Sequence, residues 1–374
     1  MRLSADPQFT PEEEVLLWAI RVDHTKDRRV AEILTAGVDW GYLQETAIQH
    51  GIVPLLYRRL KGGMADLVPS DELSTLKTLF QETAIRNLQM TQNLLKTLDL
   101  LDSSGIEVIP FKGPMLAVQA YGDLSLRSYR DLDILVHVND LSRAYQILTD
   151  QGYTLTGPGM RSIERKLGFL DKKDIRFSFC EEILEVHWKI IERLYSVPLE
   201  MDQIWDRSLA VFINDRKVKT MSPDDMVNVL CFHGFKHGWK SLNWLADLIY
   251  TISNNPQIKW QEVFVRAETM GLKRITLIGL FLVHKYGGIR CGSEIENMFA
   301  SDTTVLKLAR EIEIEMFISH KLAVRPFFYL KSRERFKDQG LFLFYFIINK
   351  ILVVLRWILR QITGSRSNPE KEVG

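Results

Sequence analysis

The sequence predicts an α+β fold, in which a small mixed sheet lies between two helical regions. Up to about residue 98, apolar residues recur at intervals of three to four, which is typical of helices. The next hundred residues contain short runs rich in β-branched and aromatic residues, which is typical of strands. Helical periodicity returns from Met201. We expect four parts: an N-terminal helical region (1–98), an α/β domain (99–200), a C-terminal helical domain (201–362) and a disordered tail (363–374).

The N-terminal region begins with a helix-entry signal. Thr10 precedes Pro11, which suits the first helical position, and three glutamates follow where the positive end of a helix dipole favours acidic side chains. Two further helical segments are expected, VDWGYLQETAIQHGIVPLLYRRL and SDELSTLKTLFQETAIRNLQMTQNLLKTLDLLDSSG. The second has Ser70 near its start and Gly105 after its end, which marks both ends of a long helix.

The middle of the chain is predicted to contain strands with one helix among them. The strand candidates are IEVIPF, LDILVHV, GYTLT, DIRFSFC and ILEVHWKI, and the helical segment DLSRAYQILTDQG lies between the second and the third. Glu181 and Glu182 alone separate the last two runs, so we expect an antiparallel hairpin there. In the C-terminal region, we expect helices over SPDDMVNVLCFHGFKHGW and SLNWLADLIYTIS.

The composition argues against several classes of protein. The chain has 374 residues, of which 25% are charged and 46% are hydrophobic, as in ordinary folded proteins. Its net charge is +1, and its basic residues do not form a broad stripe along the sequence. Both observations disfavour a nucleic-acid partner. Cys180, Cys231 and Cys291 lack the spacing of a disulfide framework or a zinc site, which indicates a reducing cytoplasm. The N-terminus has no apolar signal-peptide core, so we do not expect export.

Residues 341–359, LFLFYFIINKILVVLRWIL, approach the length of a bilayer span. Lys350 and Arg356 would make a spanning helix costly. Two other interpretations stay open, namely an interfacial helix in peripheral contact with a membrane and a buried helix of the C-terminal bundle. The buried helix is favoured, because a helix that is apolar all round is most often part of a core. We expect a cytoplasmic location and leave membrane association open.

Two aspartates occur on a strand that is otherwise apolar. Side chains alternate along a strand, so Asp131 and Asp133 point the same way, about 7 Å apart, while the opposite face is built for a core. Two carboxylates at a fixed separation suit a hard, oxygen-preferring dication that keeps its other positions for water and substrate phosphate. The alternative is an antiparallel strand with one solvated face, and the aspartates alone do not decide between the two.

Upstream of the aspartates, Lys112, Gly113 and Pro114 follow a predicted strand and open a helix. Gly113 would let the backbone approach a ligand closely, and the free amides of a first helical turn favour an anion. Lys112 adds a positive charge at the same place. Taken alone, this stretch is better explained as a solvated lysine and a glycine turn. Together with the aspartate pair, it predicts a phosphate-binding turn beside a metal-binding pair.

A third element is the strand ILEVHWKI, where Glu185, His187 and Lys189 alternate with apolar residues. If this strand pairs beside the aspartate strand, Glu185 would lie next to Asp131 and Asp133. Three carboxylates could hold one or two magnesium ions that bridge the phosphates of a nucleotide. His187 is an alternative ligand for the metal or the acceptor. Without the other motifs, a hairpin with one wet face would be the better interpretation.

The order of these motifs resembles an uncharacterised bacterial nucleotidyltransferase family of the polymerase-β-type superfamily. The resemblance is carried by VDWGYLQETAIQHGIVPLLYRRL, LRSYRDLDILV, LEVHWKI and HGFKHGWKSLNWLADL, which span most of the chain. It implies a nucleotidyltransferase fold, a mixed sheet with helices that is flanked by N- and C-terminal helical domains. It also implies binding of a nucleoside triphosphate such as ATP, with magnesium or manganese.

Individual residues are carried over from this resemblance. Asp131 and Asp133 match the family's metal-binding pair, and Glu185 matches the third carboxylate. Lys112, Gly113 and Arg127 match positions that we assign to the phosphates. The sequence departs from the wider superfamily in two ways. It has Gly-Pro in place of a Gly-Gly or Gly-Ser turn, and its aspartates come later after that turn than is usual.

Other candidates lie in the C-terminal region and in a basic loop. His233 and His237 are four residues apart, a spacing that can bind zinc, but no HExxH motif or third ligand accompanies them. We expect them to contact the acceptor or to pack in the cleft, which Asp247 one helix further on would also face. Segment 156–176 contains a cluster of basic residues that could close over a triphosphate, although a solvated loop is favoured.

The sequence thus predicts a metal-dependent enzyme that transfers a nucleoside monophosphate from a nucleoside triphosphate to an unidentified acceptor and releases pyrophosphate. The acceptor would offer a hydroxyl or phosphate group on a small molecule, a peptide or a protein. The alternative is a catalytically weak nucleotide-binding or accessory module in a surface-polymer or peptide-biosynthesis pathway. The acceptor, the preferred base and the oligomeric state are left open.

Overall fold

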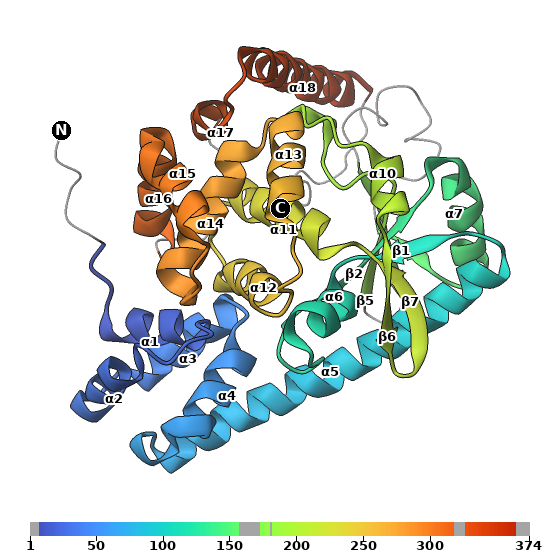
Figure 1. The fold of residues 1–374 in the computed structure, drawn as a ribbon. Helices are drawn as coiled ribbons and strands as arrows, with labels where there is room; N and C mark the ends of the chain where they lie inside the picture. Colours follow the sequence, from blue (N-terminus) through green and yellow to red (C-terminus); the bar gives the residue numbers. More distant parts are fainter. Residues whose placement is uncertain (1–6, 157–172, 180–181, 318–325, 364–374) are drawn as a thin grey trace.

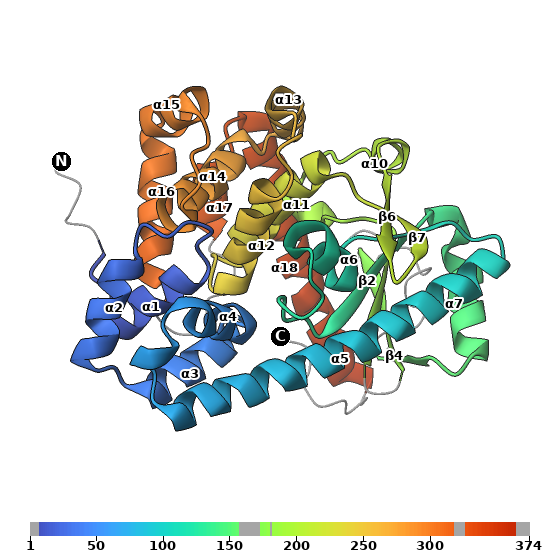
Figure 2. The same cartoon turned by 60° about the horizontal axis from the view of Figure 1, so that its bottom comes forward.

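A computed structural model of the protein describes residues 7–156, 173–179, 182–317 and 326–363. A mixed sheet lies at one end of the molecule, and helices from both ends of the sequence lie together at the other (Figure 1). The long helix α5 runs from the N-terminal helices to the sheet, as Figure 2 shows from below. The predicted α+β class is confirmed.

The N-terminal helices begin with the expected signal. The Thr10 hydroxyl accepts a hydrogen bond from the Glu13 amide, and the Glu13 carboxylate accepts one from the Thr10 amide, which closes a capping box. The chain turns between the third and fourth helices at Gly51, whose φ is +67°. The helices are α1 (Pro11–Ala19), α2 (Asp27–Ala36), α3 (Trp40–Gln49), α4 (Val53–Gly63), the 3₁₀ turn η1 (Ala65–Leu67) and α5 (Ser70–Ser103).

The main sheet has five strands in the order β1-β2-β5-β4-β3. Strands β2 and β5 are parallel, and every other pair is antiparallel, including the predicted hairpin of β4 and β5. The strands are β1 (Val108–Pro110), β2 (Asp131–Val136), β3 (Thr154–Leu155), β4 (Asp174–Phe179) and β5 (Glu182–His187). The helical elements around them are α6 (Gly113–Leu116), the π-helical turn η2 (Ala117–Tyr121), the 3₁₀ turns η3 (Val138–Asp140) and η4 (Arg193–Tyr195), and α7 (Leu141–Asp150).

The C-terminal part contains a hairpin that the sequence analysis missed. Residues 201–362 were expected to be helical, but β6 (Leu209–Ile213) and β7 (Arg216–Thr220) form a two-stranded sheet. Asn214 and Asp215 connect them with positive φ angles of 46° and 63°, as in a type I′ turn. The helices are α10 (Met201–Asp206), α11 (Pro223–Lys236), α12 (Leu242–Ser253), α13 (Trp260–Met270), α14 (Lys273–Gly287), α15 (Ser293–Ser301), α16 (Thr303–Glu315), α17 (Pro326–Ser332) and α18 (Phe336–Thr363).

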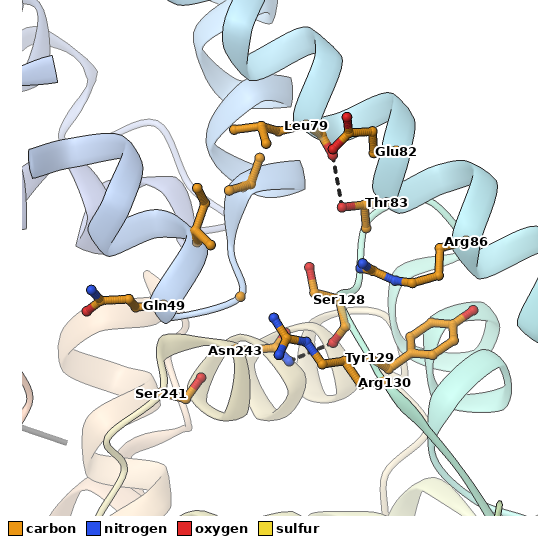
Figure 3. A pocket seen from close by; sticks show the side chains of 13 residues that line it. Gln49, Leu79, Glu82, Thr83, Arg86, Ser128, Tyr129, Arg130, Ser241 and Asn243 are labelled. Carbon is orange, nitrogen blue, oxygen red and sulfur yellow. Dashed lines mark hydrogen bonds between the residues drawn. The ribbon is translucent and has the colours of Figure 1, made fainter. Parts of the chain in front are cut away.

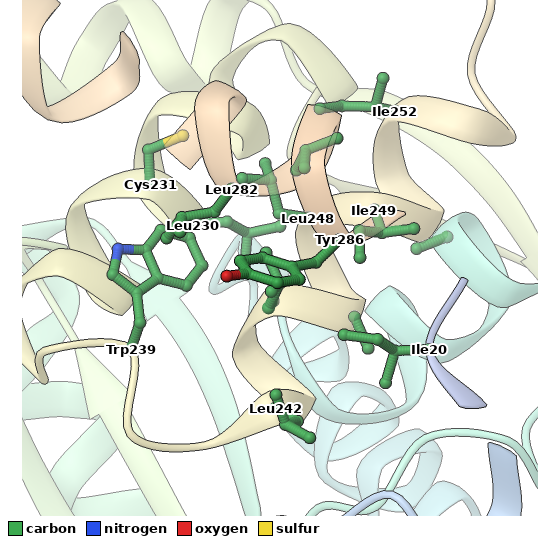
Figure 4. Packing of buried hydrophobic residues seen from close by; sticks show 14 of the residues in the cluster. Ile20, Leu230, Cys231, Trp239, Leu242, Leu248, Ile249, Ile252, Leu282 and Tyr286 are labelled. Atoms are coloured by element: carbon green, nitrogen blue, oxygen red, sulfur yellow. The ribbon is translucent and has the colours of Figure 1, made fainter. Parts of the chain in front are cut away.

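The larger hydrophobic core joins the N-terminal and C-terminal helices. Ile20, just after α1, packs in the same cluster as Trp239 and Tyr286 (Figure 4). Gly234 allows the Trp239 indole to approach α11, because a Cβ at this position would lie only 2.6 Å from the ring. A second core lies between the sheet and α5 and α7. The two helical regions are therefore packed against each other and hold the sheet at one side.

Helix α18 includes the apolar segment 341–359. The expectation of a buried helix is wrong for several described side chains, because Phe344, Ile347 and Val354 are each more than half exposed. No helix in the described part of the chain combines the length and apolar character needed to cross a membrane. Peripheral contact of this segment with a membrane stays a prediction.

Candidate active site

Two neighbouring parallel strands bring the predicted acidic residues together. Strands β2 and β5 pair with Asp133 opposite Glu185 and with Asp131 opposite Ile183. Because side chains alternate along each strand, Asp131, Asp133 and Glu185 lie on the same face of the sheet. The opposite face of β2 packs into the core beneath α5. The structure therefore places Glu185 in the register that the sequence analysis required.

His187 completes a compact cluster with two of these carboxylates. Its Nε2 lies 2.9 Å from Asp133 Oδ1 and 3.3 Å from Glu185 Oε2. All three side chains are buried, and one ligand atom from each lies within 4.8 Å of the others. Asp131 lines the same cavity but is not part of this cluster. A metal site on Asp131, Asp133 and Glu185 stays a prediction, whereas the geometry favours His187 as the third member beside Asp133 and Glu185.

Basic side chains surround the acidic cluster. Lys112 Nζ lies 3.5 Å from Asp133 Oδ1, and Arg176 Nε lies 2.8 Å from Glu185 Oε1. Lys173 Nζ lies 3.7 Å from Glu185 Oε2. The sequence analysis had given Lys173 and Arg176 no role at the acidic cluster. It counted both in the basic segment 156–176, of which residues 157–172 lie outside the described residues. Arg176 lies directly opposite Glu185 in the β4–β5 pairing. The register of the predicted hairpin could therefore have identified Arg176 as a neighbour of Glu185.

These contacts shift the ionisation of the cluster. Burial by itself raises the pKa of Asp133, but the Lys112 charge and the His187 hydrogen bond outweigh it and hold that pKa well below its usual range. Burial and the Lys173 charge act to lower the pKa of His187, but its hydrogen bonds to Asp133 and Glu185 raise it overall. Burial and the nearby Asp133 charge raise the pKa of Asp131. The pKa values of the two aspartates therefore shift in opposite directions, and Asp133 is the one held in its ionised form by the surrounding cations.

Lys112 and Gly113 form the turn between β1 and α6. Gly113 has a φ of +51°, and a Cβ there would lie 3.3 Å from the carbonyl oxygen of Asp131. A side chain at this position would therefore be strained by its backbone conformation and crowded by the aspartate strand. The predicted order of strand, glycine turn and helix is present. It brings the Lys112 amine to the Asp133 carboxylate.

Arg127 has a partner that the sequence analysis did not predict. Its Nε and Nη2 donate hydrogen bonds to the two carboxylate oxygens of Asp247 on α12, at 2.7 and 2.9 Å. Both side chains are buried, and the Tyr121 hydroxyl also donates to Asp247 Oδ1 at 2.8 Å. Arg127 Nη1 is buried without a hydrogen-bond partner among the described residues, and Arg127 lines the cavity. Its predicted contact with phosphate would have to use this remaining nitrogen.

His233 on α11 and His237 at the end of that helix line the cavity that contains the acidic cluster. Their ring centres are 4.8 Å apart, and both rings pack against Trp244. Burial and the nearby Lys112 charge lower the pKa of His233 well below its usual range, so this ring is neutral. Neutral rings next to an indole suit contact with a substrate. The predicted choice between acceptor contact and packing stays open.

The cluster lines a cavity of about 570 Å³ between the sheet and helices α11 and α12. Lys236 and Glu192 also line it and form an ion pair with each other. The sequence analysis missed both, because they are far apart in the sequence and neither lies in a recognisable motif. Acidic, basic and imidazole groups therefore meet in one cavity, which suits a substrate with several phosphates.

A model of a family described as "uncharacterised nucleotidyltransferase" matches residues 36–288. The match covers helices α3 to α5, the acidic strands and α11 to α14. The chain belongs to this family. The predicted resemblance is thereby confirmed, and membership supports transfer of a nucleoside monophosphate in general terms. No curated protein matches the chain.

The solved structures that match the chain include three with low sequence identity. The antibiotic-resistance factor ANT(2'')-Ia is 12% identical, with a TM-score of 0.36, and the match covers 53% of this chain and 98% of that one. The lincosamide antibiotic adenylyltransferase LnuA, solved with lincomycin, is 19% identical, with a TM-score of 0.32 and coverage of 44% and 96%. An antigenic nucleotidyltransferase-like protein from Paracoccidioides brasiliensis is 16% identical, with a TM-score of 0.30 and coverage of 57% and 94%.

Proposed function

We propose that the protein transfers a nucleoside monophosphate from a nucleoside triphosphate to a hydroxyl or phosphate oxygen of an acceptor. The observation that carries this proposal is the register of β2 and β5, which sets Asp133 beside Glu185 and within reach of Lys112 and His187. Family membership supports the same reaction class. ATP is our first choice of donor.

The acidic cluster fits a magnesium or manganese ion. Asp133 Oδ2 is buried and lacks a hydrogen-bond partner among the described residues, which leaves an anionic oxygen free to act as a ligand. Asp133, Glu185 and His187 supply two carboxylates and one imidazole within 4.8 Å, and Asp131 adds a carboxylate on the same face. When bound, such an ion would neutralise phosphate charge and polarise the α-phosphate.

The chain's own residues would perform the remaining tasks. The acceptor oxygen forms a bond to the α-phosphorus as the bond from that phosphorus to the bridging oxygen breaks, and pyrophosphate leaves. Glu185 accepts the proton of an acceptor hydroxyl. Lys112 and Arg127 hold phosphate oxygens, and the turn at Gly113 brings the backbone close to them. His233 and His237 would contact the acceptor or the nucleoside from the opposite wall.

The test compares the wild-type protein with Asp133→Asn. Purified protein is mixed with magnesium, a mixture of nucleoside triphosphates and a cell lysate. Pyrophosphate release is measured, and nucleotidylated products are sought by mass spectrometry. We expect Asp133→Asn to lower the rate at least 1,000-fold, which is about 4 kcal/mol of transition-state stabilisation. Asp150→Asn is the matched control, because this exposed residue at the end of α7 makes the same chemical change away from the cavity.

Equal pyrophosphate release by the wild-type protein and Asp133→Asn would contradict the proposal. If neither protein releases pyrophosphate with any acceptor, while the wild type still binds nucleotide, the alternative of a nucleotide-binding accessory module is favoured. Both variants should give the circular dichroism spectrum of the wild type, so that a loss of rate is not a loss of fold.

A further inference from the structure

A second cavity, of about 660 Å³, adjoins the proposed active site. It lies between the turn that joins α3 to α4, the middle of α5, and the segment that leads into β2 (Figure 3). Ser128, Tyr129 and Asn243 line both cavities, so the two spaces share a wall. Arg130 lines the second cavity and directly precedes Asp131, which lines the first. A ligand in the second cavity would therefore lie next to the reaction centre.

Two arginines give the second cavity its charge. Arg86 on α5 and Arg130 before β2 both point into the space, as Figure 3 shows. Within the described parts of the chain, neither guanidinium forms a hydrogen bond or an ion pair. Glu82 lies one turn before Arg86 on the same helix and also lines the cavity, but the two do not form an ion pair. The lining thus carries two cations and one anion.

The backbone that carries these arginines is firmly held. Asn87, next to Arg86, is buried, and its Nδ2 donates hydrogen bonds to the carbonyl oxygens of Leu124 and Arg127, at 2.7 and 2.8 Å. The Tyr129 hydroxyl donates to the Asn87 carbonyl at 3.3 Å. These bonds fix α5 to the segment before β2. The two arginines therefore extend from a rigid frame, which lowers the entropy cost of binding an anion between them.

The rest of the lining suits an apolar group. Ile48, which is 46% exposed, lines the cavity, as do Val53 and Leu79. An exposed isoleucine beside two unpaired arginines favours a ligand that has an anionic group next to an apolar part. A guanidinium binds phosphate through paired, charge-assisted hydrogen bonds, so phosphate is the anion that two arginines fit best.

We propose that this second cavity binds the acceptor, and that the acceptor is a small molecule with a phosphate group next to an apolar part. Arg86 and Arg130 hold the phosphate, and Ile48 contacts the apolar part. The oxygen that receives the nucleoside monophosphate reaches the carboxylates past Ser128 and Tyr129. The assignment of this ligand as an acceptor rests on the proposed transferase function, whereas the binding of a phosphate-bearing molecule does not.

The lining of the two cavities indicates that the first binds the nucleotide and the second binds the acceptor, rather than the reverse. Lys112, Gly113 and the carboxylate cluster, which would hold a triphosphate and a metal, belong to the first cavity. Among the described residues, the arginines that line the first cavity already have acidic partners: Arg127 is bound to Asp247, and Arg176 is bound to Glu185. The free cations of the second cavity are therefore available for a second substrate.

Phenyl phosphate is the probe, because it joins a phosphate to an apolar ring. Its dissociation constant is measured by ³¹P NMR titration, with and without saturating magnesium and α,β-methylene-ATP, whose P–C–P bridge prevents transfer. The proteins are wild type, the double variant Arg86→Gln/Arg130→Gln and the matched control Arg28→Gln. Arg28 is 94% exposed on α2, away from both cavities. Phenylacetate and benzyl alcohol are titrated as comparison ligands. In the first a carboxylate takes the place of the phosphate, and in the second a hydroxyl does.

We expect wild type and Arg28→Gln to bind phenyl phosphate equally, with nucleotide present or absent, and the double variant to bind it at least tenfold more weakly. Phenylacetate should bind more weakly than phenyl phosphate, and benzyl alcohol should not bind. Equal binding by the double variant, or loss of binding when nucleotide is added, would overturn the proposal. Failure of the transferase function would show separately, as absence of pyrophosphate release by wild type with every acceptor, while the difference in phenyl phosphate binding between wild type and double variant persists.

Discussion

The two neighbouring cavities of the protein differ in whether the cationic side chains that line them have acidic partners. In the first, each cation near the carboxylates has an acidic partner: Lys112 contacts Asp133, Arg176 contacts Glu185, and Arg127 contacts Asp247. In the second, Arg86 and Arg130 have no such partner within the described residues. Most charged groups of the first cavity are buried or partly buried, with Arg176 as an exposed exception, whereas both arginines of the second are exposed.

The difference follows from the cost of burying charge. A buried ion needs a partner, because its desolvation costs several kcal/mol, whereas an exposed arginine stays hydrated. A metal or a triphosphate that enters the first cavity must replace existing pairs, such as the one between Lys112 and Asp133. An anion that enters the second cavity replaces only water. The first cavity is therefore built for a substrate that brings its own charges, and the second for a simple anion.

The largest expected effect on stability comes from breaking the buried pair of Arg127 and Asp247. Asp247→Leu leaves the Arg127 guanidinium buried without a counter-charge, which should lower the free energy of unfolding by about 3–5 kcal/mol. The measurement is urea unfolding followed by circular dichroism.

The double variant Arg127→Met/Asp247→Leu serves as the control for this effect. It removes both charges and fills the space with apolar groups, so it should recover most of the lost stability. If Asp247→Leu unfolds at the same urea concentration as wild type, the pair does not stabilise the fold. The claim that the buried cations of the first cavity need acidic partners would then be wrong for Arg127.

A pH effect of intermediate size is expected from His233. Its pKa in the folded protein is lower than in the unfolded chain, so the unfolded chain binds more protons. The stability that this histidine contributes is present above its unfolded pKa, near 6.5, and is lost as the pH falls towards its folded pKa. The slope contributed by one such group is at most about 1.4 kcal/mol per pH unit.

His233→Asn should make the free energy of unfolding depend less on pH between 7 and 5, as measured by urea unfolding at each pH. His24→Asn is the comparison, because the His24 side chain is 80% exposed on the surface. The same slope in wild type and His233→Asn would show that this ring is not held neutral by its surroundings.

The sequence predicted those parts of the site that lie close together along the chain. The alternation of side chains placed Asp131 and Asp133 on one face, as the structure shows. Glu185 joins them through the parallel pairing of β2 with β5, which the sequence analysis stated only as a condition. The pairing of Arg127 with Asp247 could not be predicted, because the two residues are 120 positions apart and depend on how α12 packs. Helix packing also decides which residues from distant segments form the second cavity.

Two errors in the fold have different causes. The turn residues Asn214 and Asp215 were a local signal for the β6–β7 hairpin, and the helical pattern around them concealed it. Helix α18 was expected to be buried because it is apolar all round, yet Phe344 and Ile347 are exposed. Periodicity cannot show whether a neighbouring helix covers an apolar face, since that depends on the rest of the chain.

The smallest expected effect completes the comparison of the cavities. Arg86→Gln/Arg130→Gln should change the free energy of unfolding by less than about 0.5 kcal/mol, because both side chains are exposed and make no ion pair among the described residues. Urea unfolding of the double variant beside wild type measures this. A loss of more than 1 kcal/mol would mean that the arginines support the fold, and weaker phenyl phosphate binding would then no longer indicate a binding site. Stability within 0.5 kcal/mol, together with a tenfold loss of phenyl phosphate affinity, would identify the arginines as ligand-binding residues in a preformed cavity.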